Sequence, residues 1–189
     1  GLGQAGQFMP SERFSSGLIN DVCQDKYGYI WVATDYGLNK FHGYRFTQFI
    51  HHPDDSMTIQ SNVVTSLLCD TDGHLWIGTS KGIDRYDYAT GTFIHYPFAD
   101  GAHPRIMKIK QLKDGRIMAC TSGYHGMYAV GKKESKIFQE PNADMNHVNC
   151  FMQDSKGRFW QCCYDNVFTM RDATGVHKMT STAGFVVDF

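Results

Sequence analysis

Short apolar segments recur along the whole chain, and polar turn residues separate them. Residues 30–34 (IWVAT), 75–79 (LWIGT) and 117–121 (IMACT) are typical, because each combines aliphatic or aromatic residues with threonine over five positions. Gly, Asp and Asn lie at the ends of these segments. Segments of this length and composition predict β-strands, and we find no stretch with the longer periodicity of a helix. The sequence therefore predicts an all-β protein.

One pattern is repeated at a nearly constant interval. The segment GYIWVATDYGLNKF, Gly28 to Phe41, returns 45 residues later as GHLWIGTSKGIDRY, Gly73 to Tyr86. Its leading glycine has four copies, spaced 45, 42 and 42 residues apart: Gly28, Gly73, Gly115 and Gly157. Three residues after each glycine come Trp31, Trp76, Met118 and Trp160. A repeat of this length indicates stacked copies of one structural unit.

Residues inside the repeat have the properties of turns and of packing positions. An Asp three residues before the glycine (Asp25, Asp70, Asp154) is suited to accept turn amides, and the third unit has only a degenerate copy, Asp114–Gly115. The tryptophan is large enough to fill the space between two sheets. A second glycine, Gly37, Gly82 or Gly126, indicates another tight turn.

Each unit contains four short apolar segments, so we expect four-stranded antiparallel sheets. Units of about 40–45 residues with four strands are typical of β-propeller blades. The expected division is an N-terminal segment or outer strand at 1–14, blade 1 at 15–60, blade 2 at 61–103, blade 3 at 104–145, blade 4 at 146–183 and the start of a further blade at 184–189.

The repeats resemble those of a known family. WVATDYGLNKFHGYRF and LWIGTSKGIDRYDYATGTF are similar to the regulator-propeller repeats of bacterial hybrid two-component sensors, over about residues 15–180. The resemblance implies an N-terminal fragment, four blades of an incomplete, seven-bladed propeller, from the periplasmic part of an inner-membrane histidine kinase. It also implies that the remaining blades and downstream sensor domains are partners, that the sensor is a homodimer, and that oligosaccharides from glycans are its ligands and control polysaccharide-utilisation genes.

Composition excludes several other functions. The 189 residues carry a net charge of −1 with no basic cluster, which argues against nucleic-acid binding through this region. Six cysteines without a CxxC pair indicate packing residues, not a zinc site. The segment HHPDD, with His51, His52, Asp54 and Asp55, has no further ligand at fixed spacing and is interpreted as a solvated loop. We expect no metal, no cofactor and no catalytic residue.

The candidate ligand-binding residues occupy the gaps of the repeated motif. Between the threonine and the second glycine the residues vary: Asp35, Tyr36, Ser80, Lys81, Tyr124, His125, Tyr164 and Asp165. Aromatic rings beside polar groups can stack on a sugar and hydrogen-bond its hydroxyls. Turn residues are also polar simply because loops are solvated. Two further readings stay open: a propeller glycan lyase or glycosidase using Asp35 and Asp165, and a protein-interaction propeller without a small ligand.

Overall fold

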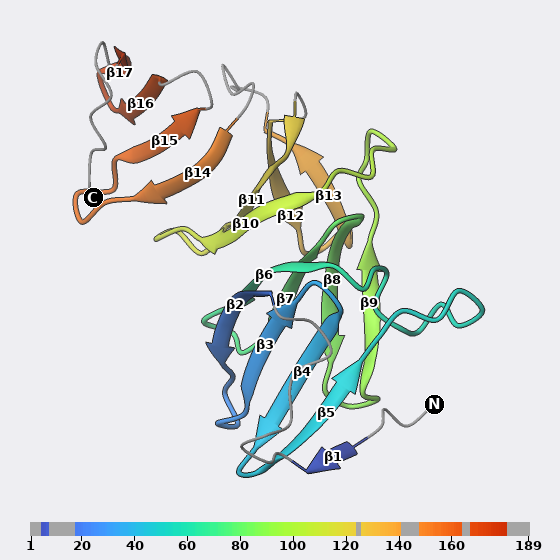
Figure 1. The fold of residues 1–189 in the computed structure, drawn as a ribbon. Helices are drawn as coiled ribbons and strands as arrows, with labels where there is room; N and C mark the ends of the chain where they lie inside the picture. The colour runs from blue at the N-terminus through green and yellow to red at the C-terminus, as the bar shows by residue number, and fades with distance from the viewer. Residues whose placement is uncertain (1–4, 8–17, 124–125, 141–147, 164–166, 181–189) are drawn as a thin grey trace.

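The chain folds into antiparallel sheets made of consecutive strands (Figure 1). The structure, a computed structural model, describes residues 5–7, 18–123, 126–140, 148–163 and 167–180. The strands are β1 (Ala5–Gln7), β2 (Ile19–Gln24), β3 (Ile30–Thr34), β4 (Gly37–His42), β5 (Arg45–Phe49), β6 (Val64–Cys69), β7 (Leu75–Thr79), β8 (Gly82–Asp87), β9 (Thr92–Tyr96), β10 (Ile106–Gln111), β11 (Ile117–Thr121), β12 (Met127–Gly131), β13 (Lys136–Gln139), β14 (Val148–Gln153), β15 (Phe159–Cys163), β16 (Val167–Asp172) and β17 (Gly175–Thr180).

Four sheets form, and each contains four strands in chain order. They are β2–β5, β6–β9, β10–β13 and β14–β17, called blades 1 to 4 below; β1 adds a fifth strand to blade 1 by pairing with β5. No α-helix occurs among the described residues, and none of them forms a segment that could span a membrane as a helix. The prediction of an all-β protein built from four-stranded propeller blades is confirmed.

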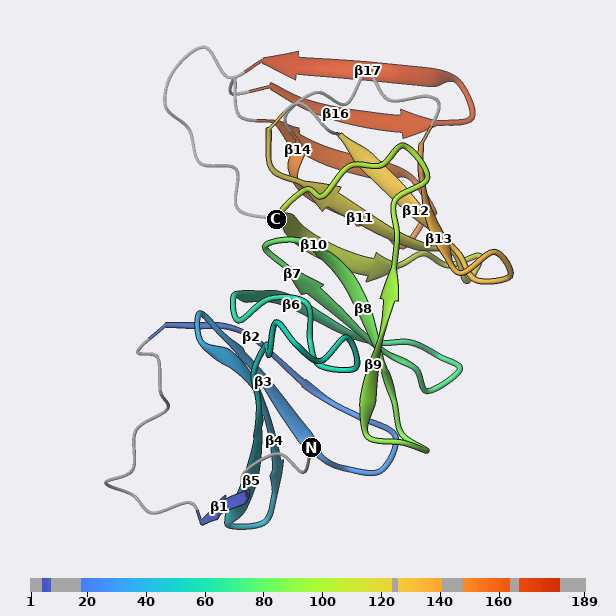
Figure 2. The same cartoon turned by 90° about the vertical axis from the view of Figure 1, so that its right-hand side faces the viewer.

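The blades follow one another as an arc (Figure 2). The first strand of each blade lies beside the first strand of the next, so that β2, β6, β10 and β14 form the inner edge. Each of these inner strands has one irregular position where its register against the second strand shifts. Such a bulge bends a strand and re-aims a side chain. The bulge thereby changes the direction of the inner-edge side chains at the same point in every blade.

The apolar cores lie between neighbouring blades. Trp31 of blade 1 is fully buried and meets the Tyr86 ring of blade 2 edge-on, at 4.8 Å between ring centroids. Trp76 of blade 2 is buried in a second cluster with Ile109 and Ile117 of blade 3. Packing between successive sheets is what lets short blades bury enough apolar area to be stable. The tryptophans of blades 1 and 2 therefore contribute to the packing between blades as well as to their own sheets.

In blades 1, 2 and 4 the side chain of an aspartate accepts a hydrogen bond from the tryptophan indole. Asp25 Oδ2 accepts the Trp31 indole N–H at 2.7 Å, while Asp25 Oδ1 accepts the backbone amides of Tyr27 and Tyr29. The same bond joins Asp70 to Trp76 at 2.8 Å and Asp154 to Trp160 at 2.9 Å. The glycine that follows has φ between 80° and 88° in all four blades, which a residue with a side chain rarely adopts.

Blade 3 departs from this arrangement in a way that the sequence analysis misplaced. Leu112, not Asp114, takes the aspartate's position, because Leu112 N bonds Arg116 O and Gly115 N bonds Leu112 O. These are the backbone bonds that Asp25 makes in blade 1. Leu112 and Met118 are both buried, in one apolar cluster. A polar pair, Asp with Trp, is thus replaced as a unit by an apolar pair.

Candidate functional site

Four of the gap residues, Asp35, Tyr36, Ser80 and Lys81, lie at one end of the blades, beside the segments that enter the inner strands. We call this end the entry face: the β3–β4, β7–β8 and β11–β12 turns with the residues just before β2, β6 and β10. One bond recurs there, from the first gap amide to the carbonyl preceding the inner strand. It joins Asp35 to Leu18 at 3.3 Å, Ser80 to Val63 at 3.0 Å, and Ser122 to Arg105 at 3.0 Å.

In blade 1 the carboxylate of Asp35 is connected to the inner strand. Asn20 Nδ2 lies 2.8 Å from Asp35 Oδ1 and also 2.8 Å from the backbone oxygen of Val64 in blade 2. Tyr36 is the next residue, and 45% of its surface is exposed. Asn20 lies at the register shift of β2. The sequence analysis missed it, and its only signal is a polar residue inside an apolar strand segment.

In blade 2 the gap residues have hydroxyl and amine groups. The Ser80 hydroxyl lies 2.7 Å from the Ser61 hydroxyl, and Lys81 is exposed. The β3–β4 turn of blade 1 is bonded to the segment that precedes β6 of blade 2, since Gly37 N donates to Asn62 O at 2.5 Å. The structure therefore brings Asp35, Tyr36, Ser80 and Lys81 to the same face. The other four candidates, Tyr124, His125, Tyr164 and Asp165, lie outside the described residues.

The loop that contains His51 and His52 is folded against blade 2. His51 Nδ1 lies 2.8 Å from Ile59 O, and Ile59 is fully buried. Where the structure describes the chain, no group of three or more His, Cys, Asp or Glu side chains is placed to hold a metal ion.

A buried carboxylate fixes the same loop. Asp84, on β8, is fully buried and accepts hydrogen bonds from Gln60 N at 2.9 Å and Gln60 Nε2 at 2.7 Å. His95 Nδ1 lies 2.5 Å from Asp84 Oδ1, and His95 Nε2 lies 2.8 Å from Ser56 O. Both imidazole nitrogens face oxygen acceptors, and the bond to Asp84 raises the pKa of His95. The protonated imidazole donates to both oxygens and so joins the loop to the sheet.

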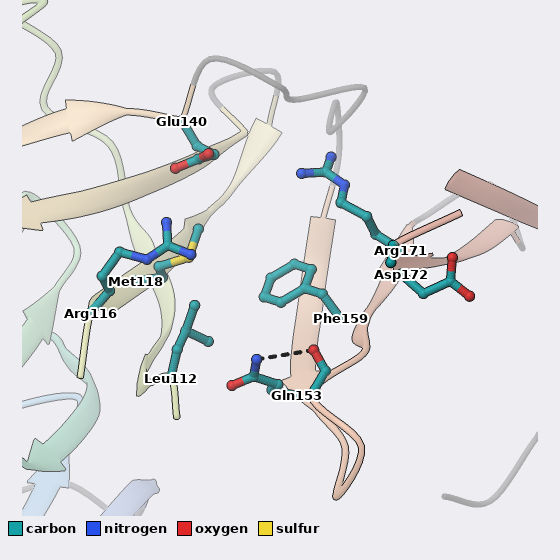
Figure 3. Close-up of a pocket in the computed structure, with 10 residues that line it drawn as sticks. Leu112, Arg116, Met118, Glu140, Gln153, Phe159, Arg171 and Asp172 are labelled. Atoms are coloured by element: carbon teal, nitrogen blue, oxygen red, sulfur yellow. Dashed lines mark hydrogen bonds between the residues drawn. The ribbon is translucent and has the colours of Figure 1, made fainter. Parts of the chain in front are cut away.

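A cleft of about 270 Å³ opens between blades 3 and 4, at the end opposite the entry face. Figure 3 shows Arg116 and Arg171 on opposite sides of it, with Phe159 between them. Leu112 and Met118 line its blade 3 wall, where an Asp–Trp pair stands in the other blades. The replacement of tryptophan by methionine is the sequence signal for this cleft.

Comparison with known proteins agrees with the repeat. The two-component regulator propeller family matches residues 13–36 and 58–81, which include the glycine–tryptophan motifs of the first two blades. These two segments therefore match two-component regulator propeller repeats. A segment of 52 residues of this chain is 42% identical to Histidine kinase P4 of Formosa agariphila; the segment covers 28% of this chain and 4% of that protein.

Solved structures share the fold of this chain at low sequence identity. The extracellular domain of a putative hybrid two-component system from B. thetaiotaomicron has a TM-score of 0.77 at 19% identity, over 94% of this chain and 26% of that one. Virginiamycin B lyase from Staphylococcus aureus has a TM-score of 0.66 at 13% identity, over 96% of this chain and 61% of that one. This chain spans about a quarter of the first of these structures.

Proposed function

We propose that the chain is part of the extracytoplasmic, ligand-sensing region of a hybrid two-component sensor histidine kinase. The observation that carries this proposal is the pair of two-component regulator propeller repeats at residues 13–36 and 58–81. The similarity to a histidine kinase and the shared fold with an extracellular domain of a hybrid two-component system support it. The kinase itself belongs to other parts of the protein, and this region is not an enzyme.

The ligand in this proposal is an oligosaccharide released from a glycan, and its binding switches on genes for polysaccharide use. The entry face supports this choice, since the exposed Tyr36 follows Asp35 in the β3–β4 turn, and Ser80 and Lys81 occupy the matching turn of blade 2. An aromatic ring can stack on the apolar face of a pyranose, and the polar groups can bond its hydroxyls.

Signalling follows from a shift in population. A ligand that contacts one arrangement of a sensor dimer better than another favours that arrangement by the difference in binding free energy. Each blade contacts its neighbours, so the difference is passed on through the interfaces between successive blades. In the proposed homodimer, the remaining blades and the downstream domains report the change to the kinase.

The alternative from the enzyme class is a propeller lyase or glycosidase. The fold shared with virginiamycin B lyase is the observation in its favour. In that case Asp35 takes part in turnover together with Asp165, which lies outside the described residues. A third alternative is a protein-interaction propeller with no small ligand.

Titration calorimetry of the purified protein against a panel of glycan oligosaccharides tests these functions. Binding without turnover supports the sensor, turnover that depends on Asp35 supports the enzyme, and the absence of both across the panel supports the interaction propeller. For an oligosaccharide that binds, Tyr36→Ala is expected to weaken affinity about tenfold, because the stacking surface is lost. Tyr44→Ala is the matched control, since Tyr44 is 77% exposed but lies on the β4–β5 turn at the opposite end of blade 1.

A further inference from the structure

Two cysteines from different blades meet at the inner edge of the arc. Cys23 on β2 and Cys69 on β6 are 46 positions apart in the sequence, and their Sγ atoms lie 3.5 Å apart. Both are free thiols, both are partly exposed, and both pack against the apolar cluster between blades 1 and 2. The sequence analysis treats all cysteines as packing residues, since two thiols so distant in the chain give no spacing signal.

The position of Cys69 has a different occupant in the other blades. It directly precedes Asp70, where the other blades have Gln24, Gln111 and Gln153. At the later interfaces this glutamine joins two blades: Thr71 N of blade 2 donates to Gln111 Oε1 at 2.9 Å, and Lys113 N of blade 3 donates to Gln153 Oε1 at 2.7 Å. The interface between blades 1 and 2 has no glutamine at this place. Cys69 occupies this position instead, and its thiol faces the Cys23 thiol.

The two thiols are not equivalent. The hydrogen bond between the two sulfurs lowers the pKa of Cys69, whereas that bond, burial and the nearby carboxylates of Asp21 and Asp25 raise the pKa of Cys23. The thiolate is the reactive form of a cysteine, so Cys69 is the group that attacks an oxidant first.

We propose that Cys23 and Cys69 form a disulfide that joins blade 1 to blade 2 when the protein meets an oxidising compartment. The oxidant is a disulfide, of a small thiol or of a thiol–disulfide oxidoreductase. The Cys69 thiolate attacks one of its sulfurs and releases one thiol, which leaves a mixed disulfide on Cys69. Cys23 then loses its proton and attacks Cys69 Sγ, and the second thiol departs. The pair loses two protons and two electrons, and the oxidant is reduced to two thiols.

Little movement is needed for this bond. A disulfide has an S–S distance of about 2.05 Å, so the two sulfurs must approach by roughly 1.5 Å. Closing the chain between residues 23 and 69 restricts the unfolded state, and it does so more for a long loop than for a short one. The disulfide thereby joins blade 2 to blade 1, as Gln111 and Gln153 join the later blades to those that precede them.

Peptide mapping after oxidation of the purified protein tests this inference without any substitution. The protein is incubated with oxidised and reduced glutathione under folding conditions, remaining thiols are alkylated, and digested peptides are analysed by mass spectrometry with and without reduction. We expect one linked pair containing Cys23 and Cys69, loss of two of the six thiols, and a rise in Tm on the order of 5–10 °C. Absence of this pair, or a link between other cysteines such as the cross-strand partners Cys150 and Cys162, overturns the inference.

Single substitutions provide the matched comparison. Cys69→Ser and Cys23→Ser should each abolish both the linked peptide and the rise in Tm on oxidation, while Cys150→Ser should keep both. An equal rise in Tm in Cys69→Ser overturns the proposed stabilisation of the blade interface. Neither result bears on ligand binding, so the proposed sensing function is tested independently.

Discussion

The buried aspartate of the blade 1 turn supports more than the turn itself. Asp25 accepts hydrogen bonds from two backbone amides, from the Trp31 indole and, at 2.8 Å, from the Tyr88 hydroxyl of blade 2. Asp25→Ala leaves these donors without an acceptor, so we expect a loss of about 3 kcal/mol in the free energy of unfolding. Urea denaturation followed by tryptophan fluorescence measures it.

Asp114→Ala is the control for this prediction. Asp114 lies in the corresponding turn of blade 3, but its side chain is 55% exposed and, among the described residues, its hydrogen bonds are with Arg116. An exposed ion pair contributes less than about 1 kcal/mol. Equal losses in the two variants would show that the aspartate acts through the turn alone and not through the tryptophan.

The pair of His95 and Asp84 predicts a dependence of stability on pH. The bond to Asp84 raises the pKa of His95 above its ordinary value of 6.5, so folding favours the protonated ring. The stabilisation is therefore complete below about pH 6.5 and is lost as the pH rises through the raised pKa. Because 36% of the His95 side chain is exposed, solvent screening limits it to about 1 kcal/mol.

Urea denaturation of wild type and His95→Gln across pH 6 to 9 isolates this effect, since other groups titrate equally in both proteins. The difference in unfolding free energy between them should shrink as the pH rises. A difference that stays constant would show that folding leaves the pKa of His95 unchanged.

At the scale of the element, the distance between blades depends on small residues. Gly78 lies in the middle strand of blade 2, and a Cβ built on it would lie 2.7 Å from Ile106 Cγ2 of blade 3. Its φ is not in the left-handed region, so steric contact is what resists a side chain; the Cβ would also lie 3.1 Å from Ile106 Cβ and 3.3 Å from Ser66 Cβ. We expect Gly78→Ala to cost about 1–3 kcal/mol through overpacking. Adding Ile106→Leu removes Cγ2 and should recover part of the loss in thermal denaturation; no recovery would show that the two Cβ contacts, which this change leaves in place, account for the loss.

Blade 3 allows a test of the Asp–Trp pair as a transferable unit. Leu112→Asp alone buries an unpaired carboxylate, and Met118→Trp alone buries an unpaired indole N–H, so each should destabilise. Together they can make the bond seen in the other blades, and the adjacent cleft of about 270 Å³ has room for the larger ring. A double-mutant cycle should give a favourable coupling of about 2 kcal/mol. Additive losses would show that blade 3 cannot accept the pair.

At the scale of the whole molecule, the fold follows from the sequence because the repeat is periodic and its apolar segments are short. The spacing of Gly28, Gly73, Gly115 and Gly157 is enough to predict the four sheets. The blade boundaries, the seven-bladed ring and the roles of the gap residues stay predictions.

The interactions between blades could not be predicted from the sequence. The meeting of Cys23 with Cys69, and of Asn20 with Val64 O, joins positions about one blade apart, and no local pattern marks which two residues face each other. Leu112 is a different case, because it lies three residues before Gly115, as Asp25 lies three residues before Gly28. The position was predictable from the sequence, but the nearby Asp114 was taken as the equivalent of the aspartate. Positions within one repeat could thus be predicted from the sequence, whereas the residue pairs that meet between blades could be identified only in the structure.

The blades of this chain are expected to differ in local stability, because their second strands differ in burial. The middle strands hold equivalent places, yet all five residues of β7 and of β11 are buried, whereas β15 has one buried residue among five. Repeat structures open locally where neighbour contacts are weakest. In hydrogen exchange followed by mass spectrometry, the amides of β7 and β11 should exchange at least about tenfold more slowly than those of β15. Equal protection in the three strands would mean that the blades unfold as one cooperative unit, so that a contact at the entry face is felt by every blade at once.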